Sequence, residues 1–196
     1  MSTLHEHNNN NATAIQSVYN NGGNLNYGGM AFTAGSSYSF TETRFWVFRA
    51  GTATTADYIV YLYRTDANHK PTGSVLASGS INTSNFTTNS TGAEYAVTWS
   101  TPYTLTNGLE YICVHTCDIV VANRPLMKGA TSGSGFCYTS DGGSTWTTVG
   151  YVSYFQNYGN DSPGSAIKTI NGLAKASVKT INGLAIESVK TWNGLA

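Results

Sequence analysis

Three side chains of the kind that bind metals or act as nucleophiles stand close together in the middle of the chain. Cys113, His115 and Cys117 alternate along one apolar run, so an extended strand would direct all three to one face. Such residues are common zinc ligands. However, a strand rises about 3.3 Å per residue, which places the two cysteines roughly 13 Å apart. One zinc ion, at about 2.0–2.3 Å from each ligand, cannot reach both. The pattern therefore favours three buried, neutral side chains.

Other residues that could carry chemistry are scattered along the chain. His5 and His7 could bind a metal from a strand-like terminus, but no third ligand stands beside them. Asp66 and Asn68 could hold Ca²⁺ through their oxygens, although this spacing is more typical of a solvated turn. The Gly/Ser-rich residues 132–135 lack the strand-turn-helix setting of a nucleophile elbow. We therefore predict no catalytic residue, no metal site and no cofactor, and a protein that is not an enzyme.

One loop matches a pattern with a defined geometry. Residues 139–146 fit the Asp-box, Ser/Thr-x-Asp-x-Gly-x-Thr-Trp, which sialidase-like propellers carry in several copies. Asp141 can accept backbone N–H bonds inside the turn, Gly143 allows unusual backbone angles, and Trp146 can pack beneath it. Thr145 completes the pattern. A single copy predicts a stabilised hairpin, with glycan binding as the alternative.

Aromatic side chains are the other candidates for ligand contact, because their flat faces stack on sugars and on partner proteins. The chain has 13 Tyr. Six of them could serve this purpose: Tyr38, Tyr61, Tyr63, Tyr103, Tyr138 and Tyr154. Packing in a core or on a sheet explains most of these positions, whereas an exposed aromatic patch on one sheet would favour ligand binding.

The composition excludes several classes of partner. Charged residues make up 10% of the 196 residues, with Lys+Arg and Asp+Glu equal at 10 each, against roughly 25% in ordinary soluble domains. No basic patch for nucleic acid or anionic membrane is present, and no apolar stretch approaches the ~18 residues of a membrane span. The first residues also lack the basic and apolar regions of a secretory signal. We expect neither nucleic acid nor membrane as a partner.

The elements that position these residues are short strands. Apolar runs are interrupted by Gly, Ser, Thr and Asn about every ten residues, which predicts an all-β sandwich or barrel. Residues 58–63 suit a central strand covered on both sides, and Tyr95, Val97 and Trp99 alternate with smaller residues. The other expected strands are 44–49, 111–115, 136–138, 146–149 and 151–155.

The last thirty residues repeat one unit three times. Residues 167–174, 178–185 and 189–196 share a pattern like Val-Lys-Thr-Ile-Asn-Gly-Leu-Ala, with lysines at 168, 179 and 190 and hence a period of 11. A unit this short cannot bury its own apolar residues and becomes stable only by stacking on copies of itself or on another surface. The repeat therefore indicates assembly or attachment.

Two structures are possible for the repeat. An 11-residue period suits a right-handed helical supercoil, whereas Asn-Gly after a β-branched run favours a short strand and a turn. Glycine costs about 1 kcal/mol inside a helix, so we favour the strand. In either form the apolar positions are the predicted assembly residues: Ile167, Ile170, Leu173, Val178, Ile181, Leu184, Val189, Trp192 and Leu195.

Two segments resemble known proteins. Residues 58–66, 70–79, 101–112 and 138–146, in this order, resemble a jelly-roll β-sandwich found in phage structural proteins and bacterial surface proteins. The likeness covers roughly residues 30–158. It implies two packed antiparallel sheets, a role in display, adhesion or assembly, and no catalytic residues. The terminal unit is similar to repeats at the ends of phage virion proteins and to Val-x-Ser-Val-Asn-Gly segments of trimeric tail fibres.

Together these observations predict an all-β chain in three parts. We expect a flexible or docking N-terminal arm at 1–27, a jelly-roll-like antiparallel β-sandwich at 28–160 and assembly repeats at 161–196. The function expected is that of a virion or extracellular structural protein: a decoration, fibre or tail-associated component of a phage. It would bind sister chains or other virion proteins. The alternatives are a carbohydrate-binding or adhesion module and a subunit of an extracellular cellular filament.

Overall fold

The computed structural model forms two compact units, Met1–Asn160 and Asp161–Ala196. The residues that it describes are 2–9, 11, 13–21, 24–52, 55–119, 121–161, 169–170, 173–174, 180–181 and 184–185. Among these residues no helix is long and apolar enough to cross a membrane. The second unit begins at the residue where the sequence predicted the repeat tail to begin.

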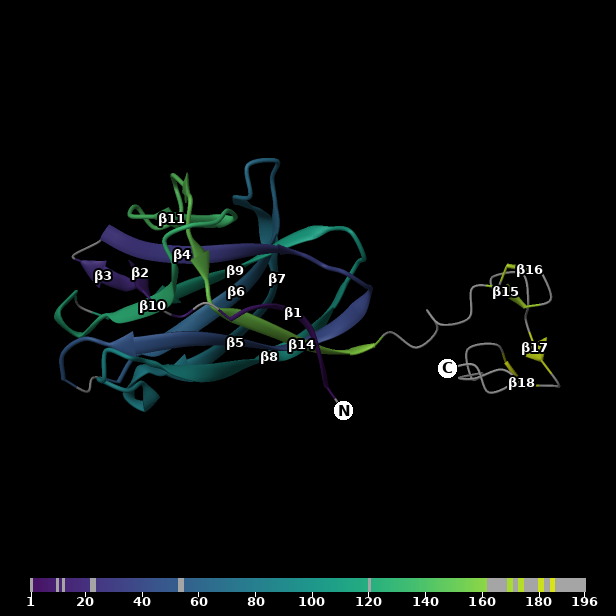
Figure 1. Cartoon of the computed structure of the whole chain (residues 1–196), viewed down its shortest axis with the longest axis horizontal. Helices are drawn as coiled ribbons and strands as arrows, with labels where there is room; N and C mark the ends of the chain where they lie inside the picture. Colours follow the sequence, from purple (N-terminus) through teal and green to yellow (C-terminus); the bar gives the residue numbers. More distant parts are fainter. Residues whose placement is uncertain are drawn as a thin grey trace. The chain divides into compact units, whose positions relative to one another are not determined.

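Where the first unit is described, it consists of strands and two short 3₁₀ turns (Figure 1). The strands are β1 (Thr3–Asn8), β2 (Thr13–Ser17), β3 (Tyr19–Asn21), β4 (Asn24–Thr33), β5 (Tyr38–Arg49), β6 (Asp57–Thr65), β7 (Pro71–Asn82), β8 (Ala93–Leu105), β9 (Glu110–Cys117), β10 (Pro125–Ala130), β11 (Phe136–Thr139), β12 (Thr147–Val149), β13 (Val152–Ser153) and β14 (Phe155–Asp161). The turns are η1 (Thr83–Asn85) and η2 (Val121–Asn123). The predicted all-β class is confirmed.

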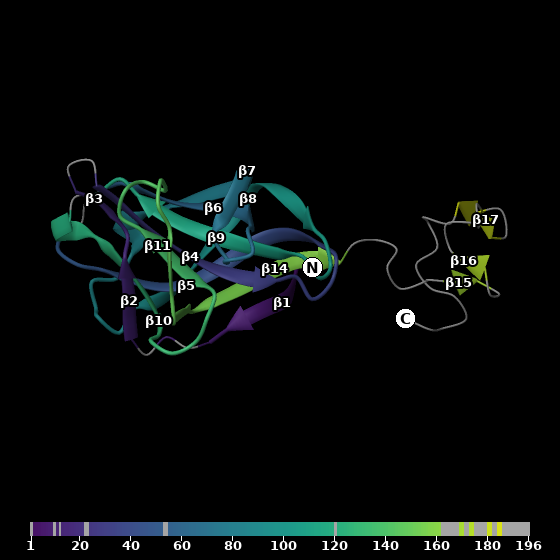
Figure 2. The same ribbon diagram turned by 90° about the horizontal axis from the view of Figure 1, so that it is seen from above.

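These strands form two antiparallel sheets, an arrangement consistent with a β-sandwich. The first sheet has the order β1-β14-β5-β10-β13, with β8 added to β5 and β2 added to β10. The second has the order β12-β11-β4-β9-β6-β7, with β3 added to β4. In Figure 1, β4 and β11 lie in the upper layer and β5 and β8 in the lower one, and Figure 2 shows the same strands from above.

The core lies between the two sheets and is rich in aromatic rings. Burial alternates along β5, so that Phe40 and Phe45 face inward, and it alternates in the same way along β8. Phe45 packs against Tyr58 at 5.2 Å and His115 at 5.0 Å between ring centroids. These contacts join β5 of the first sheet to β6 and β9 of the second, which fixes the two layers face to face.

The residues of the hypothetical metal cluster lie on this inner face of β9. Cys113, His115 and Cys117 are all buried, and both cysteines are free thiols. Burial raises the pKa of Cys117 to about 12 and lowers the pKa of His115 to about 3, so each favours its neutral form. No group of three or more metal-ligating side chains comes together within the described ranges. The three side chains are therefore core residues.

His115 makes the stability of the sandwich depend on pH. Below the ordinary histidine pKa of about 6.5, the unfolded chain takes up a proton that the folded chain does not, so the free energy of unfolding falls as pH drops towards 3. We expect a loss of about 2 kcal/mol between pH 7.5 and pH 5, and a smaller loss in His115→Gln. Urea unfolding followed by tryptophan fluorescence measures both. Equal losses in the two proteins would contradict the assignment.

The structure corrects the prediction of a flexible or docking arm at residues 1–27, because the described residues of this segment form strands of both sheets. Strand β1 pairs with β14, β2 with β10 and β3 with β4. The imidazole of His5 stacks on the ring of Tyr38, with 3.6 Å between the ring centroids. The carboxylate of Glu6 accepts hydrogen bonds from the Tyr38 hydroxyl and from the backbone N–H of Gly35. Backbone pairing and these side chains hold β1 on the sheet edge.

The few described residues of the second unit form two pairs of very short strands. Strand β15 (Thr169–Ile170) pairs with β16 (Leu173–Ala174), and β17 (Thr180–Ile181) pairs with β18 (Leu184–Ala185), both antiparallel. Each pair belongs to one copy of the repeat, and at these eight residues the backbone adopts the strand alternative. Of the predicted assembly residues, Ile170, Leu173, Ile181 and Leu184 lie in these strands, and the other five lie outside the described residues.

Candidate functional site

The second sheet carries a small apolar cluster on its outer face, away from the core. Ala31, Ile112, Val114 and Cys137 form this cluster, and Tyr27, Tyr63 and Trp146 pack against it. It exists because β9 is apolar on both faces, so that its outward side chains also need cover. Three large aromatic residues provide that cover while remaining only partly buried.

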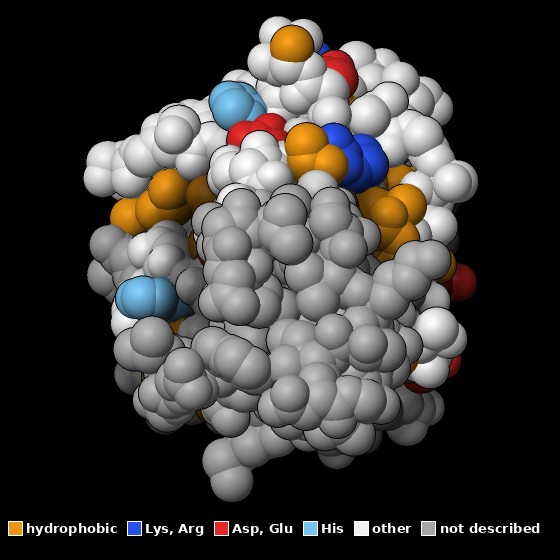
Figure 3. Space-filling model, turned by 90° about the vertical axis from the view of Figure 1, so that its right-hand side faces the viewer, with side chains coloured by type: hydrophobic (Ala, Val, Ile, Leu, Met, Phe, Trp, Pro, Cys, Tyr) orange, Lys and Arg blue, Asp and Glu red, His pale blue; other side chains and the backbone are white. Residues whose placement is uncertain are grey.

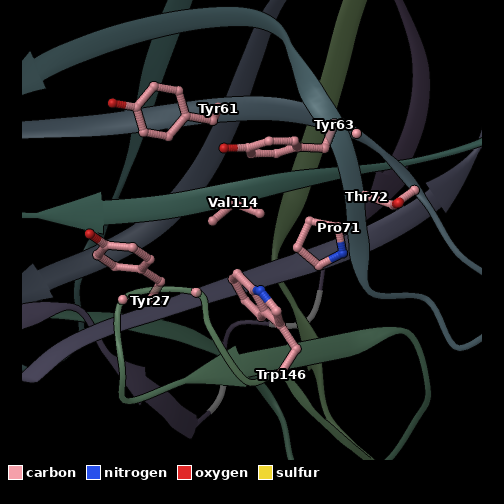
Figure 4. Close-up of a pocket in the computed structure, with 10 residues that line it drawn as sticks. Tyr27, Tyr61, Tyr63, Pro71, Thr72, Val114 and Trp146 are labelled. Atoms are coloured by element: carbon pink, nitrogen blue, oxygen red, sulfur yellow. The ribbon is translucent and has the colours of Figure 1, made fainter.

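A hollow with a volume of about 400 Å³ opens over this cluster. Val114 lies near its centre, with Tyr61 and Tyr63 on one side and Tyr27 and Trp146 on the other (Figure 4). The ring centroids of Tyr61 and Tyr63 are 6.3 Å apart. We call this site the aromatic pocket; its lining is Tyr27, Tyr61, Tyr63, Pro71, Thr72, Gly73, Val114, Gly142, Gly143 and Trp146.

Trp146 reaches the pocket from the loop between β11 and β12. The carboxylate of Asp141 accepts hydrogen bonds from the Thr139 hydroxyl at 2.5 Å and from the backbone N–H of Thr145 at 2.9 Å. These bonds lower the pKa of Asp141 to about 2. Gly142 and Gly143 have φ of 73° and 95°, which residues with a Cβ rarely adopt. The loop is therefore held together by its own residues.

Removal of the Asp141 carboxylate should loosen this loop without affecting the core. In Asp141→Ala the N–H of Thr145 loses its acceptor, so we expect its amide hydrogen exchange to quicken by about tenfold or more. The amides of β9 should keep their protection, because that strand is paired on both sides. Exchange measured by NMR tests this, and an unchanged rate at Thr145 would show that Asp141 does not organise the loop.

The beginning of β7 forms a further wall of the aromatic pocket through Pro71, Thr72 and Gly73, next to the turn that joins β6 to β7. The Asp66 carboxylate accepts the backbone N–H groups of Asn68 and Lys70 at 2.8 and 3.0 Å. Asp66 thus stabilises the turn by binding its backbone. This is the role of a turn residue, predicted from the sequence as the alternative to calcium binding.

Further hydrogen bonds fix this wall to its neighbours. The Nδ1 of His69 lies 2.9 Å from both carboxylate oxygens of Glu110. The hydroxyl of Thr148 in β12 donates to the carbonyl of Asn68 at 3.1 Å, which joins the two loops. Both walls of the aromatic pocket are therefore braced by hydrogen bonds.

The lining of the aromatic pocket is uncharged. None of its ten residues is an Asp, Glu, Lys, Arg or His. Burial, together with the nearby hydroxyls of Tyr61 and Tyr27, raises the pKa of Tyr63, so this phenol stays protonated at neutral pH. Tyrosine hydroxyls both donate and accept hydrogen bonds, and the indole N–H of Trp146 donates. The pocket thus offers flat apolar faces edged by neutral polar groups.

The outer face of the first sheet carries charged side chains, unlike the lining of the aromatic pocket. The guanidinium of Arg44 forms ion pairs with the carboxylates of Glu42 and Glu94, with N–O distances of 2.6 and 3.3 Å. Its Cζ lies 4.4 Å from the ring centroid of Tyr158. The polar and aromatic groups there bind one another. On the side of the molecule drawn in Figure 3, charged side chains of the described residues are few and lie among uncharged ones.

The structure brings together only some of the residues that the sequence singled out. Tyr61, Tyr63, Gly143 and Trp146 line the aromatic pocket. The other candidate tyrosines do not line it: Tyr38 and Tyr154 are buried, and Tyr103 and Tyr138 pack against the core. Sequence reasoning missed Tyr27, which stood at the end of the supposed arm.

Two comparisons with known proteins found no match to this chain. No protein-family model matches the chain, and no curated protein matches its sequence.

Proposed function

We propose that this protein is a non-enzymatic carbohydrate-binding protein that holds neutral sugars in the aromatic pocket. The observation that carries the proposal is the placing of Tyr27, Tyr61, Tyr63 and Trp146 around one hollow on an outer sheet face. A sugar ring has apolar C–H faces and polar edges. The C–H faces pack on aromatic rings, while tyrosine hydroxyls and the indole N–H bind the sugar hydroxyls.

The size and charge of the pocket support a neutral sugar. Its volume of about 400 Å³ lies within the ~300–1,000 Å³ range of ligand sites, which combine apolar walls with a few placed polar groups. An acidic sugar or a phosphate would require a cation in the lining, and none of the ten residues supplies one. A purely apolar ligand would leave the hydroxyls around the pocket without partners.

A second role, assembly through the repeat tail, is favoured by the three copies of the 11-residue unit. Each of the two described strand pairs has only two residues per strand, and an isolated hairpin is at best marginally stable in water. We infer that the tail binds sister chains or other virion proteins by strand addition or packing. The sandwich, of jelly-roll type, would then be the displayed body of a phage or extracellular assembly.

Electrophoresis in native gels that contain a neutral polysaccharide tests the sugar-binding role. We expect the full chain to be retarded in native gels that contain at least one of cellulose derivatives, xylan, mannan, starch or galactan, and to be released by the matching soluble sugar. The mobility of an unrelated protein of similar size corrects for sieving. Mobility unchanged in every gel would contradict the proposal.

A further inference from the structure

A second hollow lies beside the aromatic pocket on the same outer surface. Its volume is about 350 Å³. It is lined by Asp57, Ile59, Tyr61, Ser78, Gly79, Ser80, Thr98 and Ser100. We call it the hydroxyl pocket, because four of its eight residues carry an aliphatic hydroxyl. Tyr61 lines both pockets, so the two are neighbours across a single side chain.

The strand register explains why the two pockets lie next to each other. Tyr61 pairs with Ser78 and Ile59 with Ser80, so these side chains form adjacent rows on one face of β6 and β7. Along β6 the two pockets extend from Asp57 to Tyr63, a span of roughly 20 Å at about 3.3 Å per residue. The combined trough is therefore longer than one sugar ring.

Strand β8 forms the far side of the hydroxyl pocket. The hydroxyl of Ser100 donates to the carbonyl of Ser78 at 2.9 Å. A Cβ at Gly79 would lie 2.4 Å from the carbonyl oxygen of Thr98, so glycine is what permits β7 and β8 to approach so closely. As a result Thr98 and Ser100, which belong to a strand of the first sheet, extend the outer surface of the second.

The chemistry of the two pockets is complementary. The aromatic pocket offers ring faces, whereas the hydroxyl pocket offers Ser and Thr hydroxyls and the carboxylate of Asp57. A carboxylate accepts hydrogen bonds from sugar hydroxyls and repels acidic sugars. Resting on the sugar-binding role proposed above, we propose that the ligand is a linear, uncharged oligosaccharide that spans both pockets, with Tyr61 as the platform between its two ends.

Chain length is the property that tests this inference. The probes are cello-, xylo-, manno- and malto-oligosaccharides, each from the monosaccharide to the hexasaccharide, titrated into the full chain by calorimetry. In the series that binds, we expect the hexasaccharide to bind about tenfold or more tighter than the disaccharide, equivalent to about 1.4 kcal/mol. Equal affinity for the two would overturn the inference while leaving the single-pocket sugar site intact. Binding of no series, with no retention in the polysaccharide gels, would overturn both.

Filling the hydroxyl pocket separates its contribution from that of the aromatic pocket. Ser80 is exposed and lines the hydroxyl pocket but not the aromatic pocket, so Ser80→Phe should lower the affinity for the hexasaccharide about fivefold or more and leave that for the disaccharide unchanged. Ser84→Phe is the matched control, because Ser84 is exposed and lines neither pocket. Thr98→Phe, from β8, provides a second filling variant if Ser80→Phe does not fold. Full hexasaccharide affinity in a folded filling variant would overturn the inference.

Discussion

Trp146→Ala is expected to lower the affinity of the protein for the neutral glycan proposed above by about tenfold or more, equivalent to about 1.4 kcal/mol. Trp146 forms one wall of the aromatic pocket, opposite Tyr61 and Tyr63. Its loss removes the largest flat surface available to a sugar ring. The loop should persist, because its hydrogen bonds run through Asp141, Thr139 and Thr145 and not through the indole.

Trp46→Ala is the matched control for this experiment. Trp46 is also partly buried on a sheet, but it packs against Tyr154 at 5.3 Å and its indole N–H donates to the carbonyl of Thr91 at 2.9 Å. It belongs to β5 of the first sheet and does not line the aromatic pocket. Calorimetric affinity should fall in Trp146→Ala and stay unchanged in Trp46→Ala. Equal affinities in both variants would contradict the placement of the site.

Removal of residues 161–196 should abolish assembly while the sandwich still folds. Met1–Asn160 is a compact unit with its own core, so its unfolding transition should remain cooperative. The repeats cannot bury their apolar positions within one 11-residue unit, so they need copies of themselves or another surface. Light scattering coupled to size exclusion should show a concentration-dependent oligomer for the full chain and a monomer after truncation.

A matched variant separates loss of contacts from loss of length. Replacement of Ile170, Ile181 and Trp192 by Ser keeps all 196 residues but removes one apolar position from each copy of the repeat. We expect this variant to remain monomeric as well. Assembly by the truncated chain to the same size as the full chain would contradict the role of the tail.

The two proposed roles reinforce each other through multivalency. A shallow sugar site on a single sandwich binds weakly, since few atoms of the sugar are enclosed. An assembly that displays many copies turns later binding events into intramolecular ones, and avidity can then exceed the affinity of one site by about 10²–10⁴. A tail that gathers copies and a sandwich that binds glycans thus suit an adhesive particle or fibre.

The strands were predictable because the chain follows simple rules of alternation. Tyr95, Val97 and Trp99 lie in β8, where Val97 and Trp99 are buried and the residues between are exposed. The continuous apolar run at 111–115 became β9, which is paired and covered on both sides. Such local patterns indicate which side chains of a strand point into the core. They predict the strands well because burial of one face in the core is what stabilises most of them.

The N-terminal strands were not predictable from their own composition. Strand β1 carries two histidines and a glutamate, and residues 8–11 are all asparagine, which is typical of a flexible segment. Its partner, β14, lies about 150 residues further along the chain, with Thr3 opposite Gly159. Pairing at such separation depends on an available sheet edge, and no local pattern records it.

The aromatic pocket was predictable only in part for a similar reason. Tyr61, Tyr63 and Trp146 stood out by residue type and by the Asp-box-like loop. However, Tyr27, Val114 and Pro71 come from three separate strands, β4, β9 and β7. They meet only after β4 has paired with β9, β9 with β6, and β6 with β7. The alternation of Tyr61 and Tyr63 with Val60 and Leu62 was the available signal, since it places large rings on the face away from the core.

The indole N–H resonances of the tryptophans provide the most direct test of the site. The chain has four Trp, of which Trp146 lines the aromatic pocket and Trp46 and Trp99 do not. Titration of the ¹⁵N-labelled protein with the hexasaccharide of the retained polysaccharide should shift the Trp146 signal in a saturable way and leave those of Trp46 and Trp99 in place. A saturable shift at Trp46 with none at Trp146, or no shift at any indole, would contradict the account.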